Sequence, residues 1–109
     1  MSPDVLGGFE HQILLTILRL EDDLYTVPVV LELERRTGRD VAPAAVYIAL
    51  RRLEKKGLLS SAMGPATAGA GKPRRYFALT ELGMDRLRES RRTLASLSEG
   101  VETLLDEAP

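Results

Sequence analysis

The stretch Ala45–Leu59, AVYIALRRLEKKGLL, decides the fold of this chain. Its apolar residues recur at the i, i+3, i+4 and i+7 spacing of one helical face: Val46, Ala49, Leu50 and Leu53. This stripe predicts an amphipathic helix that begins at Pro43, ends at Gly57 and buries the stripe in the core. The opposite face carries Ala44, Ile48, Arg51 and Lys55, with Tyr47 and Arg52 on its two flanks.

The residues after this helix predict a β-hairpin. Leu58–Met63 and Arg74–Thr80 are the expected strands, and the segment GPATAGAGKP between them is rich in Gly and Pro, which predicts a mobile tip. A helix followed by a hairpin with a basic second strand is typical of a winged helix, in which one helix enters a DNA groove and the hairpin contacts phosphate. The order of elements therefore points to DNA.

Charge supports this interpretation through its distribution. The whole chain has 15 Lys and Arg against 16 Asp and Glu, a net charge of −1. The window Arg51–Arg75 holds seven of these cations and one acid, Glu54, which leaves +6 in the window and −7 in the remainder. Such polarity suits a protein that presents one face to phosphate. Two solvated basic turns are the plainer alternative.

Length and composition limit the function classes. A chain of 109 residues with 44% hydrophobic residues predicts one folded domain. It has no cysteine, no apolar run near the roughly 20 residues that span a bilayer, and no basic-then-apolar N-terminus typical of a signal peptide. We therefore expect a cytoplasmic protein without membrane contact.

Two further helices are expected before the recognition helix. Apolar residues recur at helical spacing in Gly8–Leu20, which predicts a first helix ended by an acidic turn. A second helix is expected over Val27–Thr37, with Thr26 as its N-cap and Gly38 after its end. We expect this second helix to bury Val27, Val30 and Leu31, with Leu33 as a further candidate.

The C-terminal region predicts one long helix that begins after the cap residue Thr80. Leu87, Leu94 and Val101 recur every seven residues, and Leu97 and Leu104 do so on the adjacent line, although Ser90 and Gly100 weaken the seam. We expect residues 1–80 to form the DNA-binding domain and residues 81–109 a dimerisation helix. The alternative is that this helix packs on its own domain. The predicted fold class is mainly α (α+β), a winged helix-turn-helix.

Taken together, these segments resemble the PadR family of bacterial transcriptional regulators. The resemblance covers nearly the whole chain, through FEHQILLTILRL, the acidic turn with Tyr25, Arg36-Thr37-Gly38, Pro43–Leu59 and Arg75–Gly83. It implies a homodimer that usually represses promoters and is often released by a ligand. Two positions depart from the family pattern, since Ala42 stands where the family usually has Ser and Ala44 where it often has Gly. The chain also resembles the short subfamily with a single C-terminal helix.

Catalytic chemistry has few candidate residues. The chain has one histidine, His11, and no cysteine, and no serine lies in a strand–turn–helix elbow. The tip glycines are not followed by the Gly-Lys-Ser/Thr that a phosphate-binding loop requires. Metal ligands are not clustered at ligand spacing either. We therefore expect neither an enzyme nor a cofactor or metal site.

Binding residues are assigned by their place on the expected helix and wing. Arg51 reaches guanine or phosphate, Lys55 is better placed for the backbone, and Ala44 and Ile48 can pack on thymine methyl groups. Tyr47 either contacts DNA or supports the helix from a half-buried position. The expected DNA-binding residues are Ala44, Tyr47, Ile48, Arg51, Arg52, Lys55, Lys72, Arg74 and Arg75. Ordinary solvated charge is the better interpretation of Arg35, Arg36 and Arg39.

The expected partners are double-stranded DNA and a second copy of the chain. The expected dimerisation residues are Phe9, Ile13, Leu87, Leu94, Leu97, Val101 and Leu104, with Leu15 packing on the partner's last helix. A small-molecule effector pocket is expected where the first and last helices of two subunits meet, lined by Phe9, Ile13 and Leu94. The alternative functions are a winged helix that binds another protein instead of DNA, and a small structural dimer.

Overall fold

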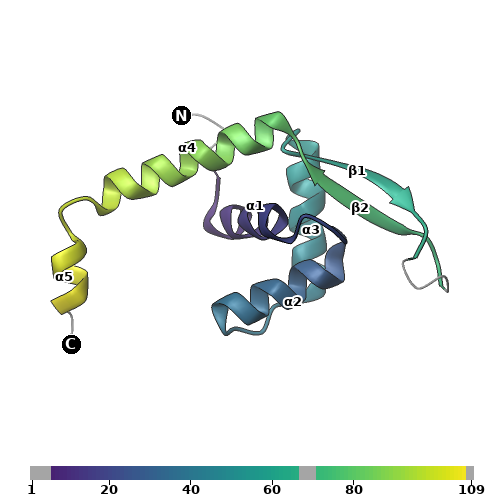
Figure 1. Cartoon of the computed structure of the whole chain (residues 1–109), viewed down its shortest axis with the longest axis horizontal. Helices are drawn as coiled ribbons and strands as arrows, with labels where there is room; N and C mark the ends of the chain where they lie inside the picture. The colour runs from purple at the N-terminus through teal and green to yellow at the C-terminus, as the bar shows by residue number, and fades with distance from the viewer. Residues whose placement is uncertain (1–5, 67–70, 108–109) are drawn as a thin grey trace.

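The computed structural model of the chain describes residues 6–66 and 71–107. Its helices and strands are α1 (Gly8–Leu20), α2 (Thr26–Thr37), α3 (Pro43–Lys55), β1 (Leu59–Gly64), β2 (Arg74–Leu79), α4 (Glu81–Ser98) and α5 (Glu102–Glu107). α1, α2 and α3 form the body of the molecule, the hairpin projects to one side, and α4 runs away to the other (Figure 1). The described residues are thus mainly helical with one small antiparallel sheet, and the predicted winged helix-turn-helix is confirmed. The predicted mobility of the tip falls partly on residues 67–70, which lie outside the described residues.

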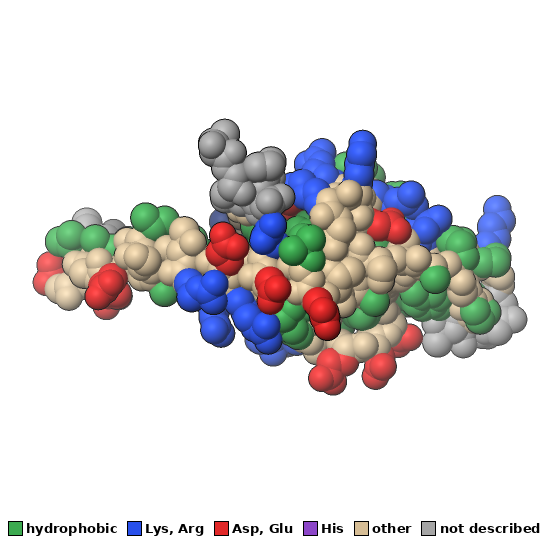
Figure 2. Space-filling model, turned by 90° about the horizontal axis from the view of Figure 1, so that it is seen from above, with side chains coloured by type: hydrophobic (Ala, Val, Ile, Leu, Met, Phe, Trp, Pro, Cys, Tyr) green, Lys and Arg blue, Asp and Glu red, His purple; other side chains and the backbone are tan. Residues whose placement is uncertain are grey.

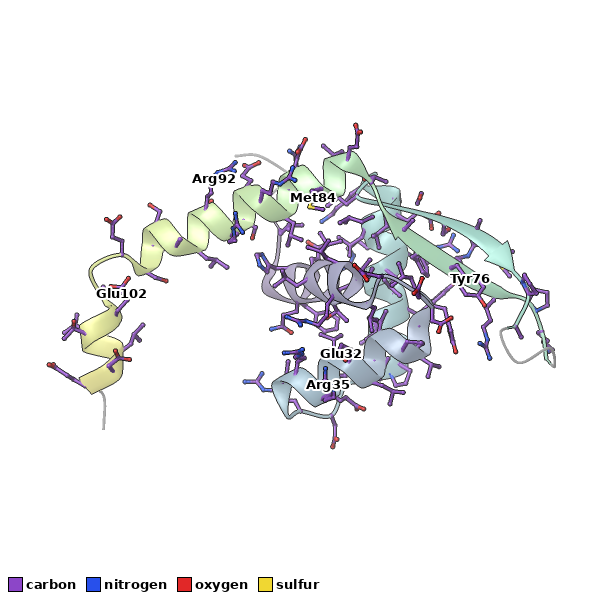
Figure 3. All side chains as sticks on the ribbon, viewed as in Figure 1. Glu32, Arg35, Tyr76, Met84, Arg92 and Glu102 are labelled. Carbon is purple, nitrogen blue, oxygen red and sulfur yellow. The ribbon has the colours of Figure 1, made fainter. Side chains whose placement is uncertain are left out.

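The hydrophobic core lies where the three N-terminal helices meet the base of the hairpin. The stripe predicted on α3 is buried there, because each of its four residues is at most 5% exposed. Side chains crowd between α1, α2 and α3, whereas those on the far half of α4 and on α5 project into open space (Figure 3). The buried apolar residues are Ile13, Leu14, Ile17, Val29, Val30, Leu33, Val46, Ala49, Leu50, Leu53, Leu58, Leu59, Phe77 and Leu87.

The predicted buried face of α2 was partly wrong. Val27 and Leu31 are 53% and 60% exposed, whereas Val29, Val30 and Leu33 are buried. Val27 and Leu31 form one apolar stripe at i, i+4 spacing, and Val29 and Leu33 form another. The stripe of Val29 and Leu33 faces α1 and α3. The helix also begins at Thr26 rather than after it, so Tyr25 is the N-cap residue.

The hairpin is held to the body through its inner strand edge. β1 and β2 pair antiparallel from Leu59 opposite Leu79 to Gly64 opposite Arg74. The backbone N–H of Phe77 donates to the carbonyl of Leu24 at 2.7 Å, so the loop between α1 and α2 extends the pairing of β2. This contact fixes the hairpin relative to α2 and thereby relative to the recognition helix α3.

α4 starts in close contact with the base of the hairpin. The hydroxyl of Thr80 accepts a hydrogen bond from the N–H of Gly83 at 3.0 Å, which confirms Thr80 as the cap. A Cβ at Gly83 would stand 2.1 Å from the carbonyl oxygen of Leu58, so only glycine allows this approach. Leu87, one turn further on, reaches the core.

The prediction of one continuous C-terminal helix was wrong. α4 ends at Ser98, and α5 begins at Glu102 after a turn in which Gly100 has φ 85°. A left-handed glycine interrupts the helical hydrogen bonds, so the seven-residue repeat does not continue along one helix surface. α5 turns away from the direction of α4 at the end of the molecule (Figure 1). No helix among the described residues is long and apolar enough to cross a membrane.

Candidate nucleic-acid interface

The exposed face of α3 has the composition that the sequence predicts. Tyr47 is 40% exposed and Ile48 is 57% exposed, and the other four predicted residues of this helix also lie on its exposed side. Arg51, Arg52 and Lys55 therefore form a cationic face, and the half-buried Glu54 lines the same hollow beside them. The described face consists of Ala44, Tyr47, Ile48, Arg51, Arg52 and Lys55.

The recognition helix begins without a side-chain cap. Ala42 stands at the N-cap position and makes no side-chain hydrogen bond, as its missing acceptor dictates. Pro43 follows at the first helical position, where its fixed φ suits the helix. The loop before it is held instead by Glu34, whose carboxylate accepts from the backbone N–H of Val41 at 2.9 Å. Therefore α3 starts where the sequence predicts it despite the substituted cap.

The predicted wing residues behave differently from one another. Lys72 is exposed and makes no hydrogen bond or ion pair with the rest of the described chain. Arg74 is half-buried, with its guanidinium 4.3 Å from the centre of the Tyr25 ring, a cation–π contact. Tyr25 in turn packs edge-on against Tyr76 at 5.6 Å between ring centres. Arg74 is therefore positioned by aromatic groups of the α1–α2 loop and the wing.

Arg75 points to the other face of β2. Its Nη1 donates to the Ser61 hydroxyl at 2.8 Å, and that hydroxyl donates to the Glu54 carboxylate on α3. On α3 itself, the Arg51 Nε lies 3.3 Å from Glu54 Oε1, and Arg51 Nη1 lies within 3.3 Å of the Tyr47 hydroxyl. A chain of polar contacts thus joins the recognition helix to the wing.

One cation of the basic window is used inside the molecule. Lys56 Nζ donates to Glu10 at 2.9 Å, which ties the end of α3 to the start of α1. Burial raises the pKa of the Glu10 carboxyl, but hydrogen bonds from Lys56 and from the Gly7 N–H outweigh it and hold that pKa below its ordinary value. Lys56 is therefore a structural residue, and it was not among the predicted DNA contacts.

A groove joins the three parts of this surface. It has a volume of about 360 Å³ and lies between the start of α2, the exposed face of α3 and the wing. Figure 2 shows lysine and arginine side chains along the upper edge of the molecule and toward the hairpin, and a second group of them on the lower edge, with acidic side chains in the middle and at the bottom of this face. The groove is lined by Tyr25, Thr26, Val27, Tyr47, Arg74 and Arg75.

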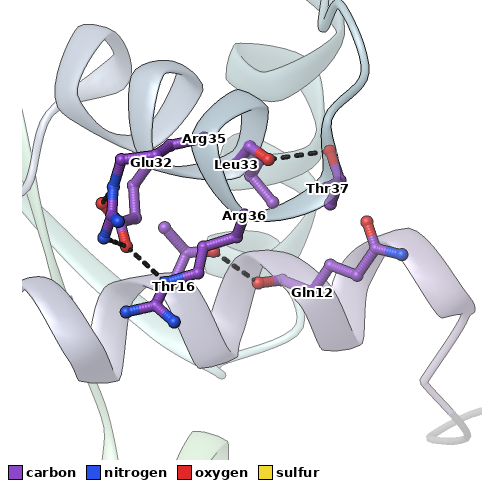
Figure 4. Close-up of polar contacts among 7 residues, drawn as sticks. All are labelled: Gln12, Thr16, Glu32, Leu33, Arg35, Arg36 and Thr37. Atoms are coloured by element: carbon purple, nitrogen blue, oxygen red, sulfur yellow. Dashed lines mark hydrogen bonds and ion pairs between the residues drawn. The ribbon is translucent and has the colours of Figure 1, made fainter.

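The arginines of α2 belong to a separate cluster. Hydrogen bonds from Arg35 and Arg36 hold the pKa of Glu32 below its ordinary value, and the three side chains lie on one side of α2 above α1 (Figure 4). A hollow of about 540 Å³ lies beside them between α1 and α2. This agrees with their interpretation as solvated structural charges, and none of them lines the groove.

The predicted dimerisation residues divide into two groups. Leu94, Leu97 and Leu104 are 52%, 72% and 66% exposed, and Phe9 and Val101 are each 37% exposed. Ile13 and Leu87 are 0% and 4% exposed, so assigning them to a dimer surface was wrong. Each sits on the side of its helix that faces the core, which the seven-residue spacing alone does not distinguish.

The predicted effector pocket needs the same correction. Ile13 is 0% exposed in the core, and Phe9 and Leu94 line two separate hollows within one chain. The hollow beside Leu94 has a volume of about 260 Å³ and is also lined by Leu6 and Leu97.

The single histidine of the chain, His11, lies at a contact between two helices. His11 Nδ1 lies 2.6 Å from the Ser90 hydroxyl, a contact between α1 and α4. No group of three or more His, Cys, Asp or Glu side chains among residues 6–66 and 71–107 could hold a metal ion. Ser90, which interrupts the predicted seven-residue repeat, therefore joins α4 to α1 through its contact with His11.

Comparison with known proteins decides the family. A family model described as the transcriptional regulator PadR-like family matches residues 14–89, which include the whole of α2, α3 and the hairpin. The chain belongs to the PadR-like family. It is therefore a transcriptional regulator rather than an enzyme.

Solved structures show the same architecture. A PadR family transcriptional regulator from Eggerthella lenta is 30% identical, with 88% of this chain and 82% of that chain covered and a TM-score of 0.69. A PadR-like regulator from Bacillus cereus has the same fold, with 23% identity, 98% and 100% coverage and a TM-score of 0.74. An uncharacterised protein from Lysinibacillus sphaericus is 30% identical over 105 residues, 94% of each chain.

Sequence reasoning missed the residues that hold this PadR-like surface together. Glu54 entered the prediction only as the one acid of a basic window, and Ser61 only as part of a strand. Tyr25 was noted for its place after the acidic turn, without its stacking role under Arg74. A polar residue at an inward position of an alternating strand was the available signal for Ser61.

Proposed function

We propose that this chain represses transcription as a homodimer that binds a two-fold symmetric DNA site. The observation that supports DNA binding is the continuous surface formed by the cationic face of α3, the groove and the wing. An α-helix of this kind fits the major groove, where Arg51 can donate to guanine and Ile48 can contact a thymine methyl group. The wing cations Lys72, Arg74 and Arg75 are proposed to contact phosphate.

The proposed dimer rests on exposed leucines of the C-terminal helices. Leu94, Leu97 and Leu104 stay exposed on α4 and α5, as do Leu15 and Leu18 on α1. Large contiguous apolar patches are uncommon on monomeric soluble proteins, and we propose that these leucines belong to such a patch. We propose that α4 and α5 of each chain pack against α1 of the other. A two-fold dimer would present two copies of α3 to half-sites about one helical turn apart.

Selection from a randomised duplex library tests the proposal. The wild type should enrich a symmetric sequence, and binding to it should weaken with salt at a log–log slope of roughly −5 to −7 if each chain neutralises three or four phosphates. A promoter carrying the enriched sequence should be repressed in a cytoplasmic reporter assay. Failure to enrich any duplex, with retained folding, would favour the alternative of a protein-binding winged helix.

We also propose a small-molecule effector at the junction of the two chains. The hollow beside Leu94 is the supporting feature, because the proposed dimer would cover it with the partner's α1. The chain contains no tryptophan to stack on a large flat ligand. Indole should therefore raise the thermal midpoint of the wild type more than ethidium does. Equal or absent shifts with both probes would remove this part of the proposal.

A further inference from the structure

The inward face of the hairpin breaks the alternation that a strand over a core should follow. Register places Ser61 opposite Phe77, and Arg75 lies two positions before Phe77 on the same face of β2. Phe77 is 3% exposed and belongs to the core, as does Leu59 on the side toward the base of the hairpin. Toward the tip, however, its neighbours on this face include a hydroxyl and a guanidinium. Polar residues at inward positions require polar partners, so this departure indicates a specific role.

The partner of both side chains is Glu54 on α3. Ser61 donates to Oε2 of Glu54 and accepts from Nη1 of Arg75, so its hydroxyl bridges helix and wing. The other carboxylate oxygen, Oε1, is buried and has no hydrogen bond, and it lies 3.3 Å from Nε of Arg51 as an ion pair. One carboxylate therefore faces the predicted base-reading arginine on one side and the wing arginine, through a hydroxyl, on the other.

The energetics of this arrangement link the two arginines. The Glu54 side chain is 26% exposed and its Oε1 atom is buried, so the polar groups beside this oxygen matter more than they would at a fully exposed carboxylate. Displacement of either arginine leaves the carboxylate more dependent on the other. Both arginines are then held at fixed distances from one group, and thereby from each other.

We propose that Glu54 and Ser61 are positioning residues that couple Arg51 on the recognition helix to Arg75 on the wing. Base recognition by Arg51 and phosphate contact by Arg75 then occur as one event, and sequence preference depends on the link as well as on the arginines. This inference rests on the proposed DNA binding. It assigns a role to two residues that need not touch DNA themselves.

A double-mutant cycle on DNA binding tests the coupling. The probe is the duplex that the wild type enriches from a randomised library, and the variants are Arg51→Ala, Arg75→Ala and both together. In the wild-type background, the combined loss of affinity should differ by about tenfold from the product of the single losses. In a Ser61→Ala background, the losses should multiply, because the bridging hydroxyl is gone.

Matched variants separate the link from general destabilisation. Ser60→Ala removes a hydroxyl from the adjacent, exposed position of β1 and should leave the coupling intact. Ser61→Thr keeps the hydroxyl and should restore it. Glu54→Gln tests the same link from the helix side. It keeps an acceptor for Ser61 but removes the charge that holds Arg51, so it should also abolish the coupling. Circular dichroism confirms that each variant is folded.

The outcomes for the link and for DNA binding are distinct. Coupling that is lost in Ser61→Ala and Glu54→Gln and kept in Ser60→Ala and Ser61→Thr supports the link. Coupling that persists in Ser61→Ala or Glu54→Gln, with tight binding by the wild type, overturns the link and leaves the proposed function in place. A wild type that enriches no duplex overturns the proposed function itself.

Discussion

The cationic surface formed by α3 and the wing includes arginines that neighbouring side chains hold in position, whereas the exposed face of α4 and α5 carries leucines that stay open to solvent. Arg51 is bracketed by Tyr47 and Glu54, and Arg74 stacks on Tyr25. Leu97 is 72% exposed in the last turn of α4, which runs away from the hairpin (Figure 1).

The difference indicates two kinds of partner. A cationic surface with preset side chains suits a polyanion of regular geometry, because less side-chain entropy is lost on binding. An apolar surface gains free energy only when another apolar surface covers it, at roughly 1.5–3 kcal/mol for each large side chain. A transcriptional regulator that binds DNA as a dimer requires both surfaces.

The largest effect is expected from a charge placed in the apolar surface of α4. Leu97→Arg should convert the proposed dimer to a monomer. Binding of the selected duplex should then fall to the level of random DNA, because each monomer contacts only one half-site. Sedimentation at micromolar concentration measures the first effect and fluorescence anisotropy the second. Ser98→Arg adds the same charge at the next, also exposed, position and is the matched control. A monomeric wild type that still binds a symmetric site tightly would contradict the dimer.

An intermediate effect distinguishes residues within the cationic surface. Arg51→Ala should weaken the selected duplex by about 1–3 kcal/mol and relax sequence preference, because it removes a base contact. Arg74→Ala should weaken selected and random duplexes alike, because a phosphate contact carries no sequence information. Competition between the two duplexes measures the ratio. If both variants gave the same ratio of affinities for the selected and random duplexes, base recognition would not belong to the helix and phosphate contact to the wing.

A smaller effect concerns stability at low pH and leaves both surfaces intact. The pKa of Glu10 is held below its ordinary value of 4.5, so its ion pair with Lys56 stabilises the fold above that value and is lost as pH falls through the folded-state pKa. Glu10→Gln should therefore lower the free energy of unfolding at neutral pH and reduce its decline below pH 4.5. Urea unfolding across this range measures both. An unchanged pH dependence in the variant would assign the decline to other carboxylates.

Helical periodicity predicted most of this fold, because burying one face of a helix sets the spacing of its apolar residues. The boundaries of α1 and the buried stripe of α3 follow from the spacing of their apolar residues alone. α2 has two apolar stripes, and only contact with α1 and α3 selects between them. The break between α4 and α5 depends on the φ of Gly100, a backbone property that a heptad count does not include.

The candidate site was predictable as a set of exposed cations but not as an arrangement. Exposure of Arg51, Arg52 and Lys55 follows directly from their position opposite the buried stripe. The engagement of Arg75 by Ser61 depends on strand register and on the approach of Glu54, which involve residues distant in sequence. Long-range contacts of this kind leave only a weak local signal, here a serine at an inward strand position.

The most direct test of the account is the affinity of one double variant for the selected duplex, measured by fluorescence anisotropy beside a variant of equal charge. Arg51→Ala/Arg74→Ala removes two cations from the proposed interface, and Arg36→Ala/Arg39→Ala removes one from α2 and one from the loop after it, both outside the interface. The account predicts a loss of roughly a hundredfold or more for the first and less than about threefold for the second. Equal affinities in the two variants would contradict the assignment of DNA binding to α3 and the wing.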